Sequence, residues 1–282
     1  MVKKPFVLGF MLVLLFTAHP LMADDSAADS PWAKFSLHMG AFLSTTNTDA
    51  RFGSGIGLSV DLEEALGLDV ENRVFRMEGS WRFTDNRRHR LDLSWFSLYR
   101  SGEKTVTDEI IITPPGGGED IEIAPGTEVK SFFDMDIYQL NYSYSFIQDE
   151  RLDFGGQVGL YIMPISFGLS VTGLIDEEAD QSFVAPLPVV GLRFDVLIAP
   201  KWYLRSGSQF FYIQYEGFTG SLVSFKSAIE YNPWKHVGFG LGVDSFRMQI
   251  EADGKEYVPE FDLRGNVQFG YAGVMLYGRV FF

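Results

Sequence analysis

The chain has 282 residues, a formal net charge of −14 and no cysteine. The negative charge excludes nucleic acid as a partner, because its phosphates would be repelled rather than neutralised, and the lack of cysteine excludes a disulfide framework and a lipidated N-terminus. Aromatic residues make up 15% of the chain, which also contains 29 glycines. This composition is typical of membrane β-barrels, which use aromatics at both interfaces and glycine where strands bend or crowd.

The N-terminal segment has the three parts of a secretory signal peptide. Lys3 and Lys4 precede an apolar run at 6–16, and a small residue, Ala23, stands directly before Asp24. This layout predicts a signal peptide at 1–23, cleaved after Ala23. The alternative is a membrane anchor, although the run is short for a bilayer helix of about 20 residues. We expect 24–31 to be a disordered leader and 32–282 to form one domain with a net charge of −16 once two lysines are removed.

The rest of the chain contains no stretch approaching 18 apolar residues, so it predicts no membrane-spanning helix. A membrane protein without such helices must be a closed β-barrel, because lipid offers no partner to free backbone amides. The alternative is a soluble secreted barrel of the lipocalin type.

Period-two alternation of apolar and polar residues predicts the strands in chain order. Residues 32–44 form the first, and 73–83 and 89–100 form a hairpin around the polar turn 84–88. Alternation predicts further strands at 134–146, 152–171, 190–198, 202–215, 223–231, 237–244 and at the C-terminal end.

Short turns at 84–88, 148–151, 199–201 and 232–235 are separated by longer, acidic connections. This regular exchange of short and long connections predicts an all-β transmembrane, antiparallel, up-and-down barrel of about ten strands. Eight or twelve strands are the alternatives, because 56–62 is either a barrel strand or part of a hairpin in the first loop. The outward parity of Val267 and Phe269 shifts by Val274, which predicts a bulge around 270–273.

The last strand ends on an aromatic residue, with apolar residues at alternating positions before it. The pattern resembles the C-terminal signal of Gram-negative outer-membrane barrels, here carried by Leu276, Val280 and Phe282. The resemblance implies an outer-membrane location and recognition by the barrel-assembly machinery and periplasmic chaperones.

Several internal segments resemble a family of uncharacterised proteobacterial outer-membrane β-barrel proteins. The resemblance covers nearly the whole mature chain, and it implies a fold and a location rather than an activity. The segments that carry it are Glu-Ala-Leu-Gly-Leu-Asp at 64–69, Trp-Arg-Phe at 81–83, Arg-His-Arg-Leu-Asp-Leu-Ser-Trp-Phe at 88–96, Tyr-Ser-Phe at 144–146 and Ala-Pro-Leu-Pro-Val-Val-Gly-Leu-Arg at 185–193.

The strand parity predicts a lumen that collects charges of both signs. We interpret them as a packed salt-bridge network that fills a narrow barrel, because buried charges must pair. The alternatives are a constricted pore or ligand recess lined by these charges, or a proton relay or gate. The predicted network comprises Arg76, Glu78, Arg82, Arg90, Asp92, Arg193, Asp195, Arg205, Lys226, Glu230, Asp244 and Arg279.

Acidic residues are concentrated in three predicted loops, at 61–71, 108–128 and 176–180. They form a solvated acidic face or, alternatively, bind divalent cations that bridge to lipopolysaccharide phosphates. No loop has the regular oxygen spacing of a dedicated calcium loop, so we predict no metal site and no cofactor. The isoleucine-rich segments at 110–112 and 121–123 predict a hairpin that protrudes above the membrane and offers a contact surface.

The sequence contains few residue patterns that are typical of catalytic sites. His89 and His236 lie beside predicted short turns, which leaves His38 as the one histidine facing the lumen. A lone lumen histidine is more often a packing residue than a general base. We therefore predict a protein that is not an enzyme, with a structural, adhesive or narrow-channel role. A surface hydrolase acting on lipid A or peptide through His38 is the alternative.

Overall fold

The computed structural model describes residues 31–52, 60–61, 63, 67–107, 110–112, 121–171, 179–215, 218–253 and 264–282. The predicted signal peptide at 1–23, and 24–30 of the predicted leader, lie outside the described residues. Within those residues no helix has the length and apolar character needed to cross a bilayer.

Long antiparallel strands make up almost all of the described chain. Their bounds are β1 (Phe35–Phe52), β2 (Val60–Asp61), β3 (Glu71–Arg82), β4 (His89–Thr105), β5 (Ile110–Ile112), β6 (Ile121–Ile123), β7 (Glu128–Gln148), β8 (Leu152–Val171), β9 (Ala179–Ala199), β10 (Trp202–Tyr215), β11 (Phe218–Tyr231), β12 (Val237–Asp253) and β13 (Arg264–Phe281).

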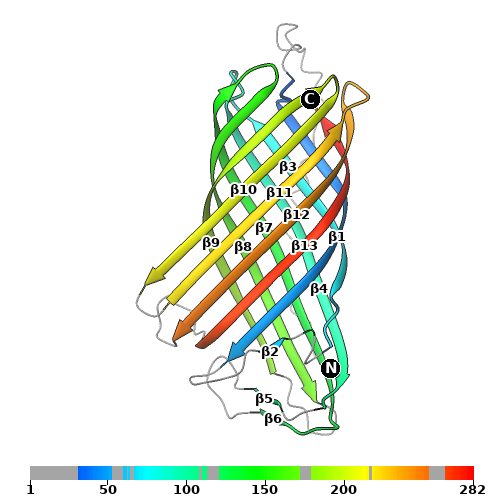
Figure 1. Ribbon diagram of the computed structural model, residues 1–282, viewed down its shortest axis with the longest axis vertical. Coiled ribbons are helices and arrows are strands. Elements are labelled where there is room, and N and C mark those ends of the chain that lie inside the picture. The colour runs from blue at the N-terminus through cyan, green and yellow to red at the C-terminus, as the bar shows by residue number, and fades with distance from the viewer. Residues whose placement is uncertain are drawn as a thin grey trace, which may run out of the picture. The chain divides into compact units, whose positions relative to one another are not determined.

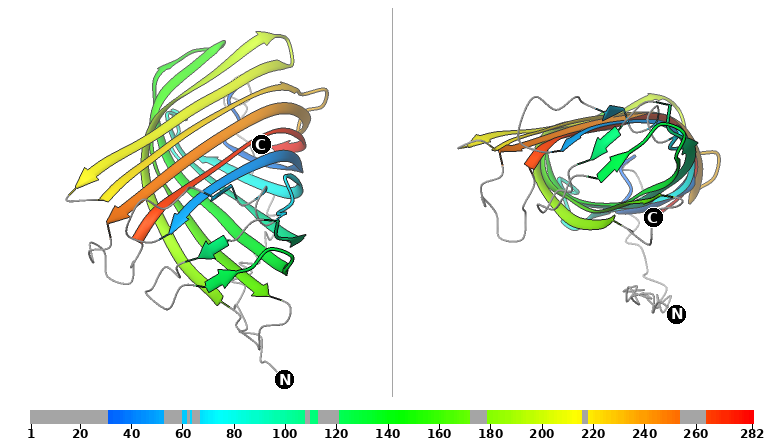
Figure 2. Two further views of the ribbon diagram at one scale, coloured as in Figure 1. Left: turned by 60° about the horizontal axis from the view of Figure 1, so that its bottom comes forward. Right: turned by 90° about the horizontal axis from the view of Figure 1, so that it is seen from below.

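Ten of the described strands close into a barrel (Figures 1 and 2). Each pairs with its neighbours in chain order, and β13 pairs with β1 to close the ring. The pairing of β9 with β10 stops at Val190 and Phe210, and that of β3 with β4 stops at Arg76 and Phe96, so the hydrogen-bonded ring is continuous only over the part of the strands nearer the turns at 83–88 and 200–201. The short strand β2 pairs with β1 at the rim, and β5 and β6 form a separate hairpin. The predicted barrel of about ten strands is confirmed, and the hairpin at 110–112 and 121–123 is present.

The connections differ in length at the two ends of the barrel. Residues 83–88, 149–151, 200–201 and 232–236 join strands at one end, which is also where β13 finishes (Figure 1). In the turn after β7, the Asp149 carboxylate accepts backbone hydrogen bonds from Arg151 (2.7 Å) and Leu152 (2.8 Å) and so supplies the turn with its own acceptor. We call this the short-turn end, and the opposite end the long-connection end.

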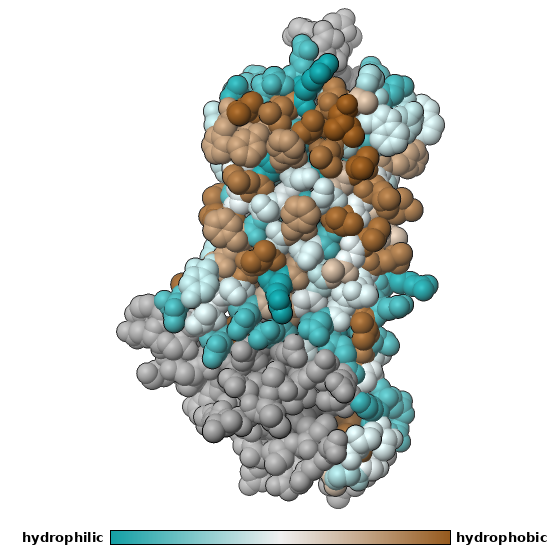
Figure 3. Space-filling view, viewed as in Figure 1, coloured by the Kyte–Doolittle hydropathy of each residue, from teal (hydrophilic) through white to brown (hydrophobic). Residues whose placement is uncertain are grey.

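The outer surface near the short-turn end is apolar. On β12 the side chains of Val237, Phe239, Leu241 and Val243 point outward and are 36–58% exposed. Comparable side chains on the other strands extend this belt around the barrel, and Figure 3 shows them gathered over the half nearer the short turns. Such a belt is suited to the hydrocarbon core of a membrane.

Further along the strands the two faces exchange character. On β12, Arg247 and Glu251 are exposed on the outside, whereas Phe246, Met248 and Ile250 are buried on the inside. A barrel segment with a polar exterior and an apolar interior has the arrangement of a water-soluble protein. The barrel therefore has a membrane-type zone near the short turns and a soluble-type zone near the long connections.

Strand β7 shows the same exchange. Near the short turns, Tyr138 and Leu140 face outward, but on the preceding residues Met135 and Ile137 are fully buried inside, and Asp136 lies on the outer face. The Asp136 carboxylate accepts hydrogen bonds from the neighbouring Ser97 and Tyr99 hydroxyls. These side chains therefore supply its hydrogen-bond donors at the boundary between the two zones.

Two sequence-based predictions need correction. The bulge at 270–273 is wrong: β13 pairs with β1 and with β12 in unbroken register, and Phe269 faces the interior with 1% exposure. The prediction failed because it assumed an apolar exterior along the whole strand. The interpretation of 56–62 as a barrel strand finds no support in the described part of that segment, because 60–61 form the two-residue β2, which lies outside the ten-strand ring.

Candidate functional site

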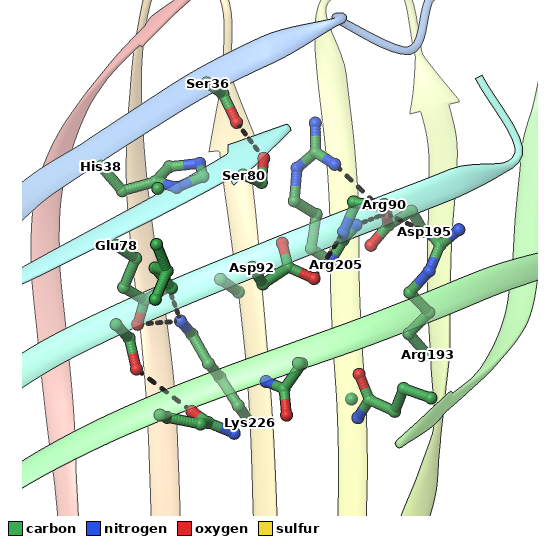
Figure 4. Close-up of a pocket in the computed structure, with 18 of the residues that line it drawn as sticks. Ser36, His38, Glu78, Ser80, Arg90, Asp92, Arg193, Asp195, Arg205 and Lys226 are labelled. Atoms are coloured by element: carbon green, nitrogen blue, oxygen red, sulfur yellow. Dashed lines mark hydrogen bonds and ion pairs between the residues drawn. The ribbon is translucent and has the colours of Figure 1, made fainter. Parts of the chain in front are cut away.

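A cavity of about 150 Å³ lies inside the membrane-type zone of the barrel. Its wall comes from every barrel strand, because inward-facing residues alternate with outward-facing ones along each strand. Figure 4 shows how the charged side chains converge from opposite sides. The residues predicted for the lumen all line this cavity: Arg76, Glu78, Arg82, Arg90, Asp92, Arg193, Asp195, Arg205, Lys226, Glu230, Asp244 and Arg279.

The larger of two charge networks surrounds Asp195. Its Oδ2 atom lies 3.0 Å from Arg90, 3.3 Å from Arg193 and from Arg205, and 3.8 Å from Arg82. These arginines have further carboxylate partners, which connect the whole set into one network. We call it the arginine network: Arg82, Arg90, Arg193, Arg205 and Arg279 with Asp92, Asp153, Asp195 and Glu230.

The second network is balanced in charge. Arg76 contacts Glu78 (2.7 Å) and Asp244 (2.5 Å), and Lys226 binds Glu78. Two cations thus face two carboxylates. The guanidinium of Arg76 also stacks over Phe96 at 4.7 Å, which places this network directly beside aromatic side chains. Most residues of the two networks are buried and each is in an ion pair, so the networks occupy much of the lumen in the membrane-type zone.

His38 lies in the wall of the same cavity. Its Nε2 atom is 3.2 Å from the Glu230 carboxylate, and its ring packs edge-on against Tyr277. It is on the fourth residue of β1, next to Arg279 in the strand register, and thus near the short-turn end. His38 therefore lies at the end of the barrel opposite the long connections.

Trp32 covers the cavity at the short-turn end. It is 2% exposed, and its indole Nε1 donates a hydrogen bond of 2.7 Å to the backbone oxygen of Asp149. Its ring contacts Tyr203 on β10, and its own backbone oxygen accepts a 2.6 Å bond from Arg87. The segment before β1 therefore reaches partners on strands and turns far from β1 in the ring.

An apolar layer closes the cavity on the other side. It fills the lumen of the soluble-type zone with side chains that are no more than 5% exposed, and ring contacts such as the stacked pair Phe246–Tyr271 (5.2 Å) hold it together. We use the name apolar layer for Phe42, Phe96, Leu98, Met135, Ile137, Met163, Ile165, Leu222, Phe246, Met248, Ile250, Phe269 and Tyr271.

Arg100 is the centre of a hydrogen-bonded polar cluster beyond the apolar layer, which we call the polar knot. Its guanidinium binds Glu63, Thr46 (3.1 Å) and Thr48 (2.6 Å), and it stacks over Phe133 at 4.8 Å. Glu63 belongs to the connection between β2 and β3 and also accepts the Thr48 backbone amide at 2.9 Å. The knot attaches this connection to the inner wall of the barrel.

Three residues of the site were not predicted from the sequence: Asp153, Arg100 and Glu63. Asp153 is fully buried and bridges Arg82 (2.6 Å) and Arg193 (3.0 Å). The alternation in the strand after 148–151 places Asp153 on the inner face, so the sequence alone was sufficient to include it. The pairing of Arg100 with Glu63 had no such signal, because it joins a strand to a loop.

The described residues contain no group of three or more histidine or acidic side chains that could hold a metal ion. The acidic stretches at 108–109 and 176–178 lie outside the described residues. Of the residues in the C-terminal pattern, Leu276 and Phe282 are each 64% exposed and Val280 is partly exposed, all on the outer face of the barrel.

Comparison with solved structures agrees with the barrel geometry. The outer membrane protease OmpT from Escherichia coli matches with a TM-score of 0.55 and 10% identity, covering 88% of this chain and 96% of that one. The fold is that of an outer-membrane β-barrel. At this identity the likeness concerns the fold alone.

Two further structures match with lower scores. The attachment invasion locus protein Ail of Yersinia pestis has a TM-score of 0.37 and 10% identity over 87% of this chain and 99% of that one. OprG from Pseudomonas aeruginosa has a TM-score of 0.35 and 10% identity over 90% and 97%. No family model and no curated protein sequence matches the chain.

Proposed function

We propose that this protein is a non-conducting, non-enzymatic barrel of the Gram-negative outer membrane, with a structural or adhesive role performed at its long-connection end. The observation that carries the proposal is the apolar layer, whose members are almost completely buried across the lumen of the soluble-type zone. A water-filled channel needs a continuous polar path, and packed aromatic and aliphatic side chains interrupt it.

The outer surface and the short turns support this location. The apolar belt suits lipid, short turns face the periplasm in barrels of this class, and the long connections face outward. We propose export by the signal peptide at 1–23, insertion by the barrel-assembly machinery and periplasmic chaperones, and contact with lipopolysaccharide, in part through divalent cations. Membership of the uncharacterised proteobacterial barrel family is part of the same proposal.

The soluble-type zone supports a role outside the membrane. Because its exterior is polar and its interior is a packed apolar core, this zone is suited to water, and the β5–β6 hairpin lies at the same end of the barrel (Figure 1). A rigid platform with projecting loops is the usual arrangement for a binding surface.

Planar-bilayer recording of the refolded protein tests the closed lumen. We expect no stable single-channel conductance from the wild type, nor from Arg73→Ala, which removes an exposed charge on the outer face of β3. A stable wild-type conductance that changes in Arg76→Ala or Arg82→Ala, but not in Arg73→Ala, would contradict the proposal and favour a narrow pore lined by the charge networks.

Excision of the β5–β6 hairpin tests the adhesive role. Val106 and Thr127 pair through a 2.9 Å backbone hydrogen bond, and Gly126 donates to the Val106 oxygen at 2.7 Å, so the base of the loop stays closed when 108–124 is replaced by a glycine-serine linker. We expect the shortened protein to keep heat-modifiable gel migration while cells that carry it adhere several-fold less to surfaces.

Cells with Asp85→Ala, a change in a short turn at the opposite end, should adhere like the wild type. Unchanged adherence after the excision would contradict the adhesive role of the hairpin, and only the structural role would remain.

A further inference from the structure

The arginine network carries one positive charge more than its carboxylates can balance. Five guanidinium groups are connected by ion pairs to four carboxylates, before any proton on His38 is counted. The neighbouring network of Arg76, Lys226, Glu78 and Asp244 is neutral and supplies no spare negative charge. An uncompensated charge in a buried site is strongly unfavourable.

The excess is most evident at Arg279, whose one carboxylate partner among the described residues, Glu230, is shared with Arg205. Both guanidiniums contact one atom, Glu230 Oε2, at 2.5 and 3.3 Å. That carboxylate is already shared with Tyr277, whose hydroxyl donates to Oε1 at 2.9 Å, and with His38. Arg205 Nη2 and Arg279 Nε are two of the buried side-chain atoms of the described residues that have no hydrogen-bond partner; His38 Nε2, Arg76 Nε and Asp244 Oδ1 in the same cavity wall are others. Two buried donors thus lie next to the Glu230 carboxylate, which already contacts the side chains of four residues.

The unpartnered donors belong to residues that line the 150 Å³ cavity. A cavity of about this volume is large enough for a ligand of about six heavy atoms. Trp32 packs at its short-turn end and the apolar layer lies at the other. The cavity is not sealed, because the Lys226 side chain in its wall remains 31% exposed, so a bound group would be partly shielded from bulk water. Electrostatic attraction is much stronger in such a site than at the surface.

We propose that the lumen cavity is a binding site for a small monovalent carboxylate, held by Arg205 and Arg279. One negative charge neutralises the arginine network, and a planar carboxylate matches the fork of donors that a guanidinium presents. A dianion such as phosphate replaces an excess positive charge with an excess negative one, so it binds more weakly. The site is independent of the adhesive or structural role proposed above.

Calorimetric titration of the refolded, full-length protein with acetate tests the site. The buffer contains a bulky anion, because chloride is small enough to compete. We expect saturable one-to-one binding by the wild type, with inorganic phosphate weaker. Arg279→Met removes the excess charge and a donor, so its affinity for acetate should fall at least about tenfold.

A change of opposite sign separates charge balance from loss of fold. Asp92→Asn adds a second uncompensated positive charge to the same network, so its affinity for acetate should rise, whereas the exposed control Arg73→Met should bind like the wild type. No saturable binding by the wild type, or equal affinities in Asp92→Asn, Arg279→Met and the wild type, would overturn the proposal.

Discussion

Replacing Asp195 with alanine is expected to lower the free energy of unfolding by about 3–5 kcal/mol, the range found when one partner of a buried ion pair is removed. The Asp195 carboxylate is 3% exposed and is the shared partner of Arg82, Arg90, Arg193 and Arg205. Without it, four guanidiniums remain close together inside the barrel with insufficient negative charge. Their mutual repulsion and lost hydration both favour the unfolded chain.

Urea titration of the refolded protein, followed by tryptophan fluorescence, measures this change. Asp85→Ala is the matched control, because Asp85 is an exposed carboxylate in the turn between β3 and β4. It should change the free energy of unfolding by no more than about 0.5 kcal/mol. If both variants lose the same small amount, Asp195 does not organise the arginine network.

The fold was largely predictable because alternation and turn length act locally. The polar turn at 84–88 and the alternation on either side of it are enough to place β3 and β4. The same reasoning placed the inward charges, since parity alone puts Arg76 and Asp244 on the inner face. Neither step requires knowledge of which strands lie opposite each other across the lumen.

The soluble-type zone was not predicted, because the alternation was assumed to have one meaning along the whole strand. On β7 the apolar face changes from Tyr138 and Leu140 outside to Met135 and Ile137 inside. The period of two continues through this point, and only its sense is reversed. Phe269 was assigned to the exterior for the same reason. The distance from the end of a strand, compared with the thickness of a bilayer, is the signal that identifies the reversal.

The individual ion pairs could not be predicted from the sequence either. Lys226 binds Glu78, which is 148 residues away, and Arg76 binds Asp244, 168 residues away. Such pairs depend on barrel closure and on the stagger between strands. Alternation gives the inner face of each strand, but it gives no information about which inward residues meet.

The reversal connects the stability of the barrel with its proposed role. A barrel that ended at the membrane surface would present its loops on flexible strand ends. Here the strands continue into a zone with its own apolar core, so the rim is supported by packing from within. The same packing blocks the lumen. In this barrel a rigid outer platform and an open channel therefore exclude each other.

Phe246→Ala provides the sharpest test of that core. The side chain is 2% exposed, and its ring packs against Tyr271 (5.2 Å), Tyr161 (5.6 Å) and Phe269 (6.2 Å). Truncation leaves a cavity among rigid neighbours on several strands. The expected loss is about 3–5 kcal/mol in the free energy of unfolding, as for other buried phenylalanines.

The control is Phe225→Ala, on the outer face of β11 in the membrane-type zone, where the side chain is 47% exposed. Lipid chains move into the space that this truncation leaves, so no cavity persists and the cavity part of the cost is absent. Urea titration in lipid vesicles should therefore show a smaller loss for Phe225→Ala than for Phe246→Ala. Equal losses would mean that the interior of the soluble-type zone is as fluid as lipid, and a fluid interior cannot support a rigid platform or seal the lumen.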